Sequence, residues 1–193
     1  MSRIMKKIIA IIVLLASAES VFAQSTFKPG VGVNFTNISG TADDVSGNIG
    51  WQIGASIEFG KKLYFEPGLF YLTENAEAST IDNGVTTFTD AKFSGLRVPL
   101  TVGLNVLGNT ESTFGLRVFG GSSAFLLTGV SDGLNKDDFN SPKWGVFAGA
   151  GIDLALFYLD WSYQWSVTNI QKSIDDIDFG KTNGIFLTAG LRF

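Results

Sequence analysis

The chain has 193 residues, a formal net charge of −4, no cysteine and no histidine. The acidic balance gives no support for nucleic-acid binding, which requires a basic surface, and the lack of cysteine excludes disulfides and thiolate chemistry. The length suits one domain. A hydrophobic fraction of 45% is compatible with soluble and membrane β-proteins alike, so the pattern along the chain has to decide between them.

The first 23 residues resemble a cleavable export signal. An apolar run over residues 8–16 follows a basic start, and small residues lead to Val21-Phe22-Ala23, a typical cleavage site. The run is about nine residues long, whereas a membrane-spanning helix needs about 20. We therefore expect residues 1–23 to be removed and residues 24–193 to form one barrel domain. The basic residues of the start are Arg3, Lys6 and Lys7.

Eight later segments alternate apolar residues with small or polar ones at period two, which is typical of strands with two different faces. No segment after the export signal reaches 20 continuous apolar residues, so no transmembrane helix is expected. The predicted fold is all-β: an eight-stranded antiparallel up-and-down transmembrane β-barrel. In chain order the segments are residues 27–38, 50–60, 62–73, 92–106, 112–128, 143–155, 156–170 and 183–193.

The two faces of these strands differ in chemistry, as residues 92–106 illustrate. One face carries little charge and is dominated by glycine, serine and threonine across the strands, which suits a narrow lumen better than a water-exposed surface. The other face is apolar and would meet lipid in a membrane barrel. The apolar face of this segment is Leu96, Val98, Leu100, Val102, Leu104 and Val106.

The few charges on the inward face are balanced in sign. Because an unpaired buried charge is costly, we predict a self-neutralising ionic network in the lumen. In particular, we expect Arg97 and Arg117 to pair with Glu66, Asp153 or Asp160. The predicted network contains Lys28, Arg97, Arg117, Arg192, Glu58, Glu66, Asp153 and Asp160.

The connections between segments alternate in length. Outer-membrane barrels have short periplasmic turns and long external loops, so both termini are predicted to be periplasmic and the acid-rich long connections external. Outward aromatic residues are expected as two belts at the membrane interfaces. The long connections are residues 39–49, 74–91, 129–142 and 171–182, and the short ones lie at Lys61, residues 107–111 and the turn at Ala155 and Leu156.

Two prolines fall inside predicted strands. Pro67 and Pro99 each remove a hydrogen bond from the ladder. Either local bulges accommodate them, or the strand registers differ there from the simple alternation.

Several segments resemble the PorT-like outer-membrane β-barrel family, often labelled "porin family", of small eight-stranded OmpA/OmpX-type barrels. The final strand ends on an outward Phe193 and resembles the terminal signature that such barrels present to the assembly machinery. The resemblance implies outer-membrane lipid and that machinery as partners. It also implies a secretion-apparatus or extracellular partner reached through the loops. The segments are residues 65–71 (FEPGLFY), 95–100 (GLRVPL), 120–127 (GGSSAFLL), 145–153 (GVFAGAGID), 161–165 (WSYQW), 168–170 (TNI) and 184–193 (GIFLTAGLRF).

No catalytic set is evident. A serine nucleophile would lack its usual histidine base, and no metal-ligand spacing or phosphate-binding loop occurs. Arginines on the same face explain the paired Asp153 and Asp160 structurally. We therefore predict a non-enzymatic protein without catalytic residues, cofactor or metal.

The lumen limits the remaining functions. Eight strands leave no continuous aqueous pore once side chains fill the interior. Inward phenylalanines near the loop end either line a small apolar pocket or plug the barrel. The prediction is an integral outer-membrane protein with a structural or binding and assembly role, and the alternative is a soluble, exported lipocalin-like carrier of a hydrophobic ligand. The phenylalanines are Phe70, Phe147 and Phe186, with Phe119 deeper.

Overall fold

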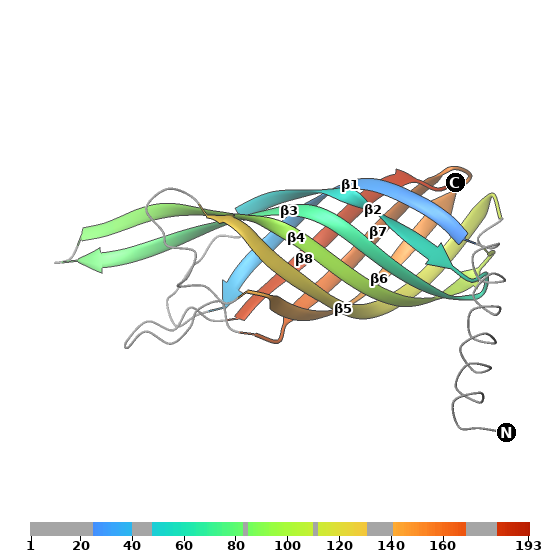
Figure 1. The fold of residues 1–193 in the computed structure, drawn as a ribbon. Coiled ribbons are helices and arrows are strands. Elements are labelled where there is room, and N and C mark those ends of the chain that lie inside the picture. Colours follow the sequence, from blue (N-terminus) through green and yellow to red (C-terminus); the bar gives the residue numbers. More distant parts are fainter. Residues whose placement is uncertain (1–24, 40–47, 83–84, 110–111, 131–140, 169–180) are drawn as a thin grey trace, which may run out of the picture.

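In the computed structural model the described residues form a closed barrel of eight antiparallel strands, each paired with its neighbours in the chain and β8 with β1 (Figure 1). The structure describes residues 25–39, 48–82, 85–109, 112–130, 141–168 and 181–193. This topology confirms the predicted fold class. The strands are β1 (Ser25–Ser39), β2 (Asn48–Phe59), β3 (Leu63–Asp82), β4 (Val85–Leu107), β5 (Phe114–Val130), β6 (Lys143–Leu154), β7 (Phe157–Ser166) and β8 (Lys181–Leu191).

Within these ranges, no helix has the length and apolar character that crossing a membrane requires.

The barrel closes along the seam between the first and last strands. β1 and β8 pair from Gly30 opposite Gly190 to Ser39 opposite Lys181. Beyond this ladder the backbones of Phe27 and Phe193 exchange two hydrogen bonds of 2.9 Å. The C-terminal residue therefore forms part of the closure.

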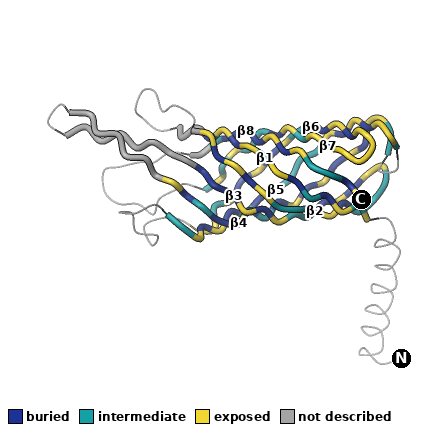
Figure 2. Tube along the Cα trace, turned by 90° about the horizontal axis from the view of Figure 1, so that it is seen from above, coloured by how far each residue is buried: buried dark blue, intermediate teal, exposed yellow. Residues whose placement is uncertain are grey.

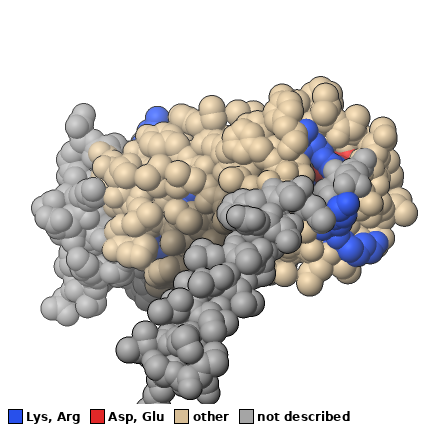
Figure 3. Space-filling view, turned by 45° about the vertical axis from the view of Figure 1, so that its right-hand side comes forward, with Lys and Arg blue, Asp and Glu red and all other residues tan. Residues whose placement is uncertain are grey.

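Where the burial of side chains is described, it alternates along the strands, with apolar side chains outside and mostly polar ones inside (Figure 2). Val31 is 57% exposed and Leu69 53%, whereas Lys28 and Arg117 are each 1% exposed. A flank of the barrel shows almost no charged atoms, and Lys and Arg gather at one end (Figure 3). Such a surface suits contact with lipid, as in a membrane barrel.

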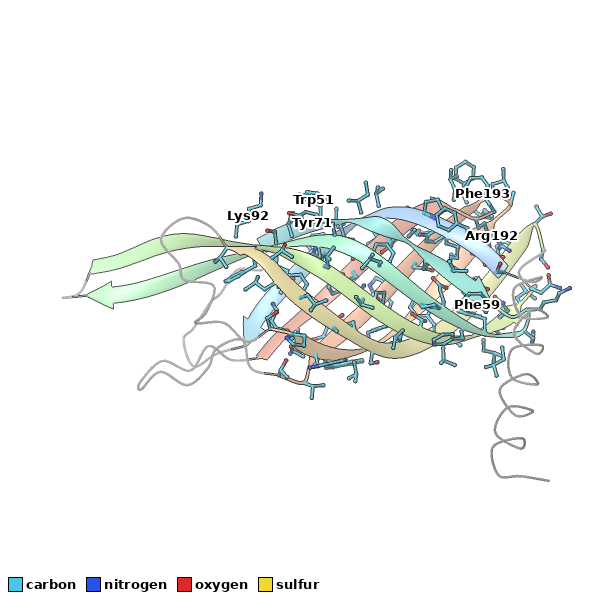
Figure 4. All side chains as sticks on the ribbon, in the orientation of Figure 1. Trp51, Phe59, Tyr71, Lys92, Arg192 and Phe193 are labelled. Carbon is cyan, nitrogen blue, oxygen red and sulfur yellow. The ribbon has the colours of Figure 1, made fainter. Side chains whose placement is uncertain are left out.

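Outward aromatics form belts near both ends of this apolar surface (Figure 4). Trp51 and Tyr71 contact each other near the loop end, with ring centroids 5.6 Å apart. Trp161 is exposed between the belts, and Phe59 is half-buried. The exposed belt residues are Phe35, Trp51, Tyr71, Trp144 and Trp165 at the loop end, and Phe27, Phe65, Phe114, Phe157 and Phe193 at the turn end.

The three short connections lie where they were predicted, and each contains one residue with positive φ. Gly60 has φ of 117° and Gly108 of 74°, conformations that glycine adopts without steric cost. The turn between β6 and β7 instead places Ala155 at φ of 53°. This two-residue turn therefore carries a conformational strain that the other two avoid.

Neither expectation for the prolines is correct. The β2–β3 register is the same on both sides of Pro67, from Ser56 opposite Gly68 to Phe59 opposite Phe65. Pro99 pairs with Ser123 in an unbroken stretch of the β4–β5 ladder. The register shifts lie elsewhere in that ladder, at Ser94/Gly95 and Asn105/Leu107. A single missing donor is tolerated because the flanking pairs hold the register.

The predicted long loop over residues 74–91 is wrong. β3 and β4 continue through it as a paired hairpin, from Asn75 opposite Lys92 to Asp82 opposite Val85, and this ribbon projects beyond the barrel (Figure 1). The sequence of this stretch carries no apolar face at period two, so hydrophobic alternation does not mark it as a strand.

The other predictions about chain ends and external loops fall outside the described residues. They concern the export signal over residues 1–23 and most of the long connections, namely residues 40–47, 131–140 and 169–180.

Candidate functional site in the barrel lumen

Seven charged side chains meet in the half of the lumen near the short turns, and we call them the inner ionic cluster. Arg117 is at its centre: its Nη2 lies 2.6 Å from Asp160 Oδ1 and 3.4 Å from Asp153 Oδ1. Its Nη1 lies 3.4 Å from Glu58 Oε2 and 3.6 Å from Glu66 Oε2. The members are Lys28, Glu58, Glu66, Arg117, Asp153, Asp160 and Arg192.

Two further cations complete the inner ionic cluster. Lys28 Nζ lies 2.9 Å from Glu66 and 3.5 Å from Glu58. Arg192 Nη1 lies 3.0 Å from Asp153 Oδ2. Every carboxylate therefore faces at least one cation, which offsets the cost of removing these charges from water.

Glycines in the wall make room for this cluster. Arg117 lies opposite Gly151 on β6, and Gly151 lies opposite Asp160 on β7. A Cβ atom at Gly151 would collide with Asp160 Oδ1 and with the Arg117 side chain. The ion pair between Arg117 on β5 and Asp160 on β7 is thus possible because β6, which lies between these two strands, has no side chain at this point.

Two tyrosines cover the inner ionic cluster. Lys28 Nζ lies 4.6 Å from the ring centroid of Tyr158, and the Arg117 guanidinium lies 5.5 Å from it. Tyr64 fills the opposite wall, where a Cβ at Gly103 would overlap its ring. Together the charged and aromatic side chains occupy the narrow interior.

Arg97 does not join this cluster, so its predicted pairing with Glu66, Asp153 or Asp160 is wrong. Glu66 lies opposite Thr101, four residues along β4 from Arg97, a separation of about 13 Å in a strand. Arg97 instead donates from Nε and Nη2 to Gln164 Oε1, at 3.3 and 2.9 Å. Its guanidinium lies 4.4 Å from the Phe186 ring centroid and 5.4 Å from that of Phe147.

The inward phenylalanines surround Arg97 in the half of the lumen near the loops. Phe70, Phe147 and Phe186 are buried, and Phe119 contacts Phe147 edge to face at 6.5 Å between centroids. Phe186 also belongs to an apolar core that closes this end of the lumen. That core, which we call the outer core, contains Leu72, Phe93, Phe125, Leu127 and Phe186.

A second charged pair lies beside the outer core and was not singled out from the sequence. Lys143 Nζ lies 2.7 Å from Glu74 Oε2 and 4.7 Å from the Phe125 ring centroid. Glu74 had been assigned to an external loop, so its pairing inside the lumen was missed. The signal was present in the alternation, which places Lys143 on the inward face of its strand.

The space that remains in the lumen is small. A cavity of about 50 Å³ lies between the inner ionic cluster and the phenylalanines, bordered by Glu66, Asp160, Phe70 and Arg97. A second cavity of about 20 Å³ lies nearer the loops. Ligand pockets for small organic molecules are typically several hundred Å³. These voids are therefore of a size for water or a small ion.

Groups of three or more His, Cys, Asp or Glu side chains arranged to hold a metal ion do not occur in the part of the chain that the structure describes. Where carboxylates do gather, the cations of Lys28, Arg117 and Arg192 occupy the positions beside them.

A soluble lipocalin-like carrier is not favoured by this arrangement. Such a barrel needs a polar exterior and an apolar ligand cavity, whereas here the exterior is apolar and the inner half of the lumen is charged.

Comparison with known proteins agrees with the architecture. The model of the family described as "Outer membrane protein beta-barrel domain" matches residues 8–193. No curated protein matches the chain at a significant level.

Three solved structures are similar to the chain at low sequence identity. Ail, the attachment invasion locus protein of Yersinia pestis, is 14% identical with a TM-score of 0.47, covering 88% of this chain and 99% of Ail. In its complex with the heparin analogue sucrose octasulfate, Ail is 16% identical with a TM-score of 0.44, covering 88% of this chain and 99% of that chain. OprG from Pseudomonas aeruginosa is 11% identical with a TM-score of 0.49, covering 88% of this chain and 93% of OprG. Because the family model spans nearly the whole sequence, the chain belongs to the outer membrane protein β-barrel family and is located in the bacterial outer membrane.

Proposed function

We propose that this protein is a sealed outer-membrane barrel that acts by binding at its external end and does not conduct solutes. The observation that carries the proposal is the inner ionic cluster, which joins β1, β2, β3, β5, β6 and β7 and the residue after β8 across the lumen. Arg117, at its centre, is 1% exposed. A passage through this layer would have to break several buried ion pairs at once.

The outer core supports the same proposal as a second barrier. Phe125, Phe186 and Leu72 are each buried beside Arg97 or Lys143. The cavities of about 50 and 20 Å³ on either side of Arg97 are too small for a sugar or an amino acid. The phenylalanines accordingly act as a plug and do not form a ligand pocket.

Reconstitution into a planar lipid bilayer tests the closed lumen. We expect the purified barrel to insert without stepwise conductance, under conditions where a general diffusion porin gives clear steps. Regular openings of the wild-type protein, with an amplitude that scales with salt concentration, would overturn the proposal.

The proposed binding role uses the two ends of the barrel differently. At the periplasmic end Phe193, which is 64% exposed beside the β1–β8 seam, is the proposed contact for the barrel-assembly machinery. At the other end the projecting β3–β4 hairpin supports contact with an extracellular or secretion-apparatus partner. Crosslinking from the hairpin in intact cells tests this second contact, and labelling only from the periplasmic turns would contradict it.

A further inference from the structure

The lumen charges separate into two groups of opposite net charge. In the inner ionic cluster three cations face four carboxylates, so the group carries a net charge of −1. Nearer the loops, Arg97 and Lys143 face one carboxylate among the described residues, that of Glu74, which gives a net charge of +1. Glu74 is matched by Lys143 at 2.7 Å. The unmatched charge of the outer group is therefore that of Arg97.

Arg97 is buried without a counter-charge of its own: among the described residues its electrostatic partner is Glu74, the carboxylate that Lys143 already pairs with. It is 5% exposed, and in its hydrogen bonds with the described residues the acceptor is the neutral amide oxygen of Gln164. Arginine is seldom buried without a charged partner. A guanidinium has five N–H donors, so donors remain after Nε and Nη2 have bonded to one oxygen. Arg117 differs in its charge environment, because it contacts four carboxylates.

The smaller cavity lies beside this unmatched charge. It has a volume of about 20 Å³, and Arg97, Lys143 and the shared carboxylate of Glu74 all border it, together with Gln164 and Phe186. Lys143 has three donors, and Glu74 is the carboxylate paired with it. The cavity is large enough for one water-sized occupant. Two cations that share one carboxylate thus border a void of monatomic-ion size, and the charge of the three groups together is +1.

We propose that this outer cavity binds one chloride ion between Arg97 and Lys143. The ion supplies the negative charge that the outer group lacks. It leaves the Lys143–Glu74 pair in place and completes the coordination of the Arg97 guanidinium. Bound chloride then holds Arg97 against Phe186 and stabilises the plug at the loop end of the lumen.

Chloride-35 NMR line width tests the site directly, because exchange with a protein site broadens the resonance of the free ion. The full mature barrel is folded in zwitterionic detergent, and empty micelles give the background. We expect the wild-type protein to broaden the line above the micelle background, and we expect Arg97→Gln to lose most of this additional broadening. Arg192→Gln is the matched control, since it removes a buried arginine from the inner ionic cluster and should keep the broadening.

Heat-modifiable migration on gels verifies that each variant is folded. Equal broadening by wild type and Arg97→Gln, or no broadening by wild type, would overturn the proposal. The same holds if Arg192→Gln loses the signal while remaining folded, because the anion would then not depend on Arg97 specifically.

A second measurement needs only the wild type. Ligand binding to the folded state raises the unfolding temperature by mass action. At equal ionic strength we expect chloride to raise the midpoint by about 2–5 °C over gluconate, which is too large for the cavity. Identical midpoints in the two salts would contradict a chloride site even if Arg97→Gln fails to fold.

Discussion

At the scale of single residues, Arg97 and Arg117 show what an inward-facing charge does and does not reveal. Both were predicted to face the lumen from the alternation of their strands, and both are buried. Their partners differ because Arg117 lies in the row of Gly151 and Asp160, whereas Arg97 lies in the row of Phe70 and Phe125. The face on which a residue lies follows from its own strand. The height of that residue along the barrel axis depends on how the strands pair with one another.

Arg117→Ala is expected to destabilise the barrel strongly. Removing one partner from a buried ionic group leaves uncompensated carboxylates, which typically costs about 3–5 kcal/mol. Urea unfolding in lipid vesicles measures the change. The control is Lys62→Ala at the exposed β2–β3 turn, where a change within about 0.5 kcal/mol is expected. A loss of similar size in both variants would contradict a central role for Arg117.

At the scale of elements, the turns and the seam decide how the strands are joined. The short turns were located from sequence because the apolar alternation breaks there. The extension of β3 and β4 into a hairpin was missed because its residues show no apolar alternation, although Asn83-Gly84 is a dipeptide typical of tight hairpin turns. Hydrophobic periodicity finds strands only where lipid or a core selects one face.

Ala155→Gly is expected to stabilise the protein. Ala155 has φ of 53°, a left-handed conformation that costs about 1–2 kcal/mol for a residue with a Cβ. Glycine removes this cost, and after its larger loss of chain entropy a gain of about 0.5–1 kcal/mol remains. The urea midpoint should therefore rise. Ala150→Gly, on the lipid face of β6, should instead lower it, and a similar shift in both variants would argue against strain at Ala155.

Phe193→Ala is expected to impair assembly in cells more than stability in vitro. The backbone hydrogen bonds of Phe193 to Phe27 survive the substitution, so refolding into vesicles should change little. If the terminal aromatic is recognised during assembly, the amount of folded protein in the outer membrane should fall. Phe27→Ala, in the same belt, should assemble normally. An equal loss for both variants would point to general interface anchoring.

At the scale of the whole molecule, the apolar exterior and the polar interior show that the barrel is suited to a lipid bilayer and not to water. Leu100 is exposed near the middle of the apolar run on β4, and Leu107 is exposed at its turn end. A soluble protein would tolerate a charge at either position. A barrel in a bilayer would tolerate it only near the interface, because lipid cannot solvate the charge at the midplane.

Leu100→Arg should therefore cost about 2–4 kcal/mol in vesicles, and Leu107→Arg about 0–1 kcal/mol. Denaturant unfolding of both variants in the same lipid measures the two changes in the free energy of unfolding, and their difference reports how deep each position lies in the bilayer. Equal costs would mean that Leu100 does not lie at the centre of the lipid band.

The sequence by itself determined the number of strands, the face of each that meets lipid and the identity of most of the lumen-facing charges, Glu74 being the exception. It could do so because side-chain direction alternates with period two in every strand, whatever the rest of the chain does. Only the tertiary structure decided which of those charges meet, since closing the barrel staggers the strands and sets the height of every residue. That stagger placed Arg117 among four carboxylates and Arg97 beside Gln164, and it divided one expected network into two groups of opposite charge.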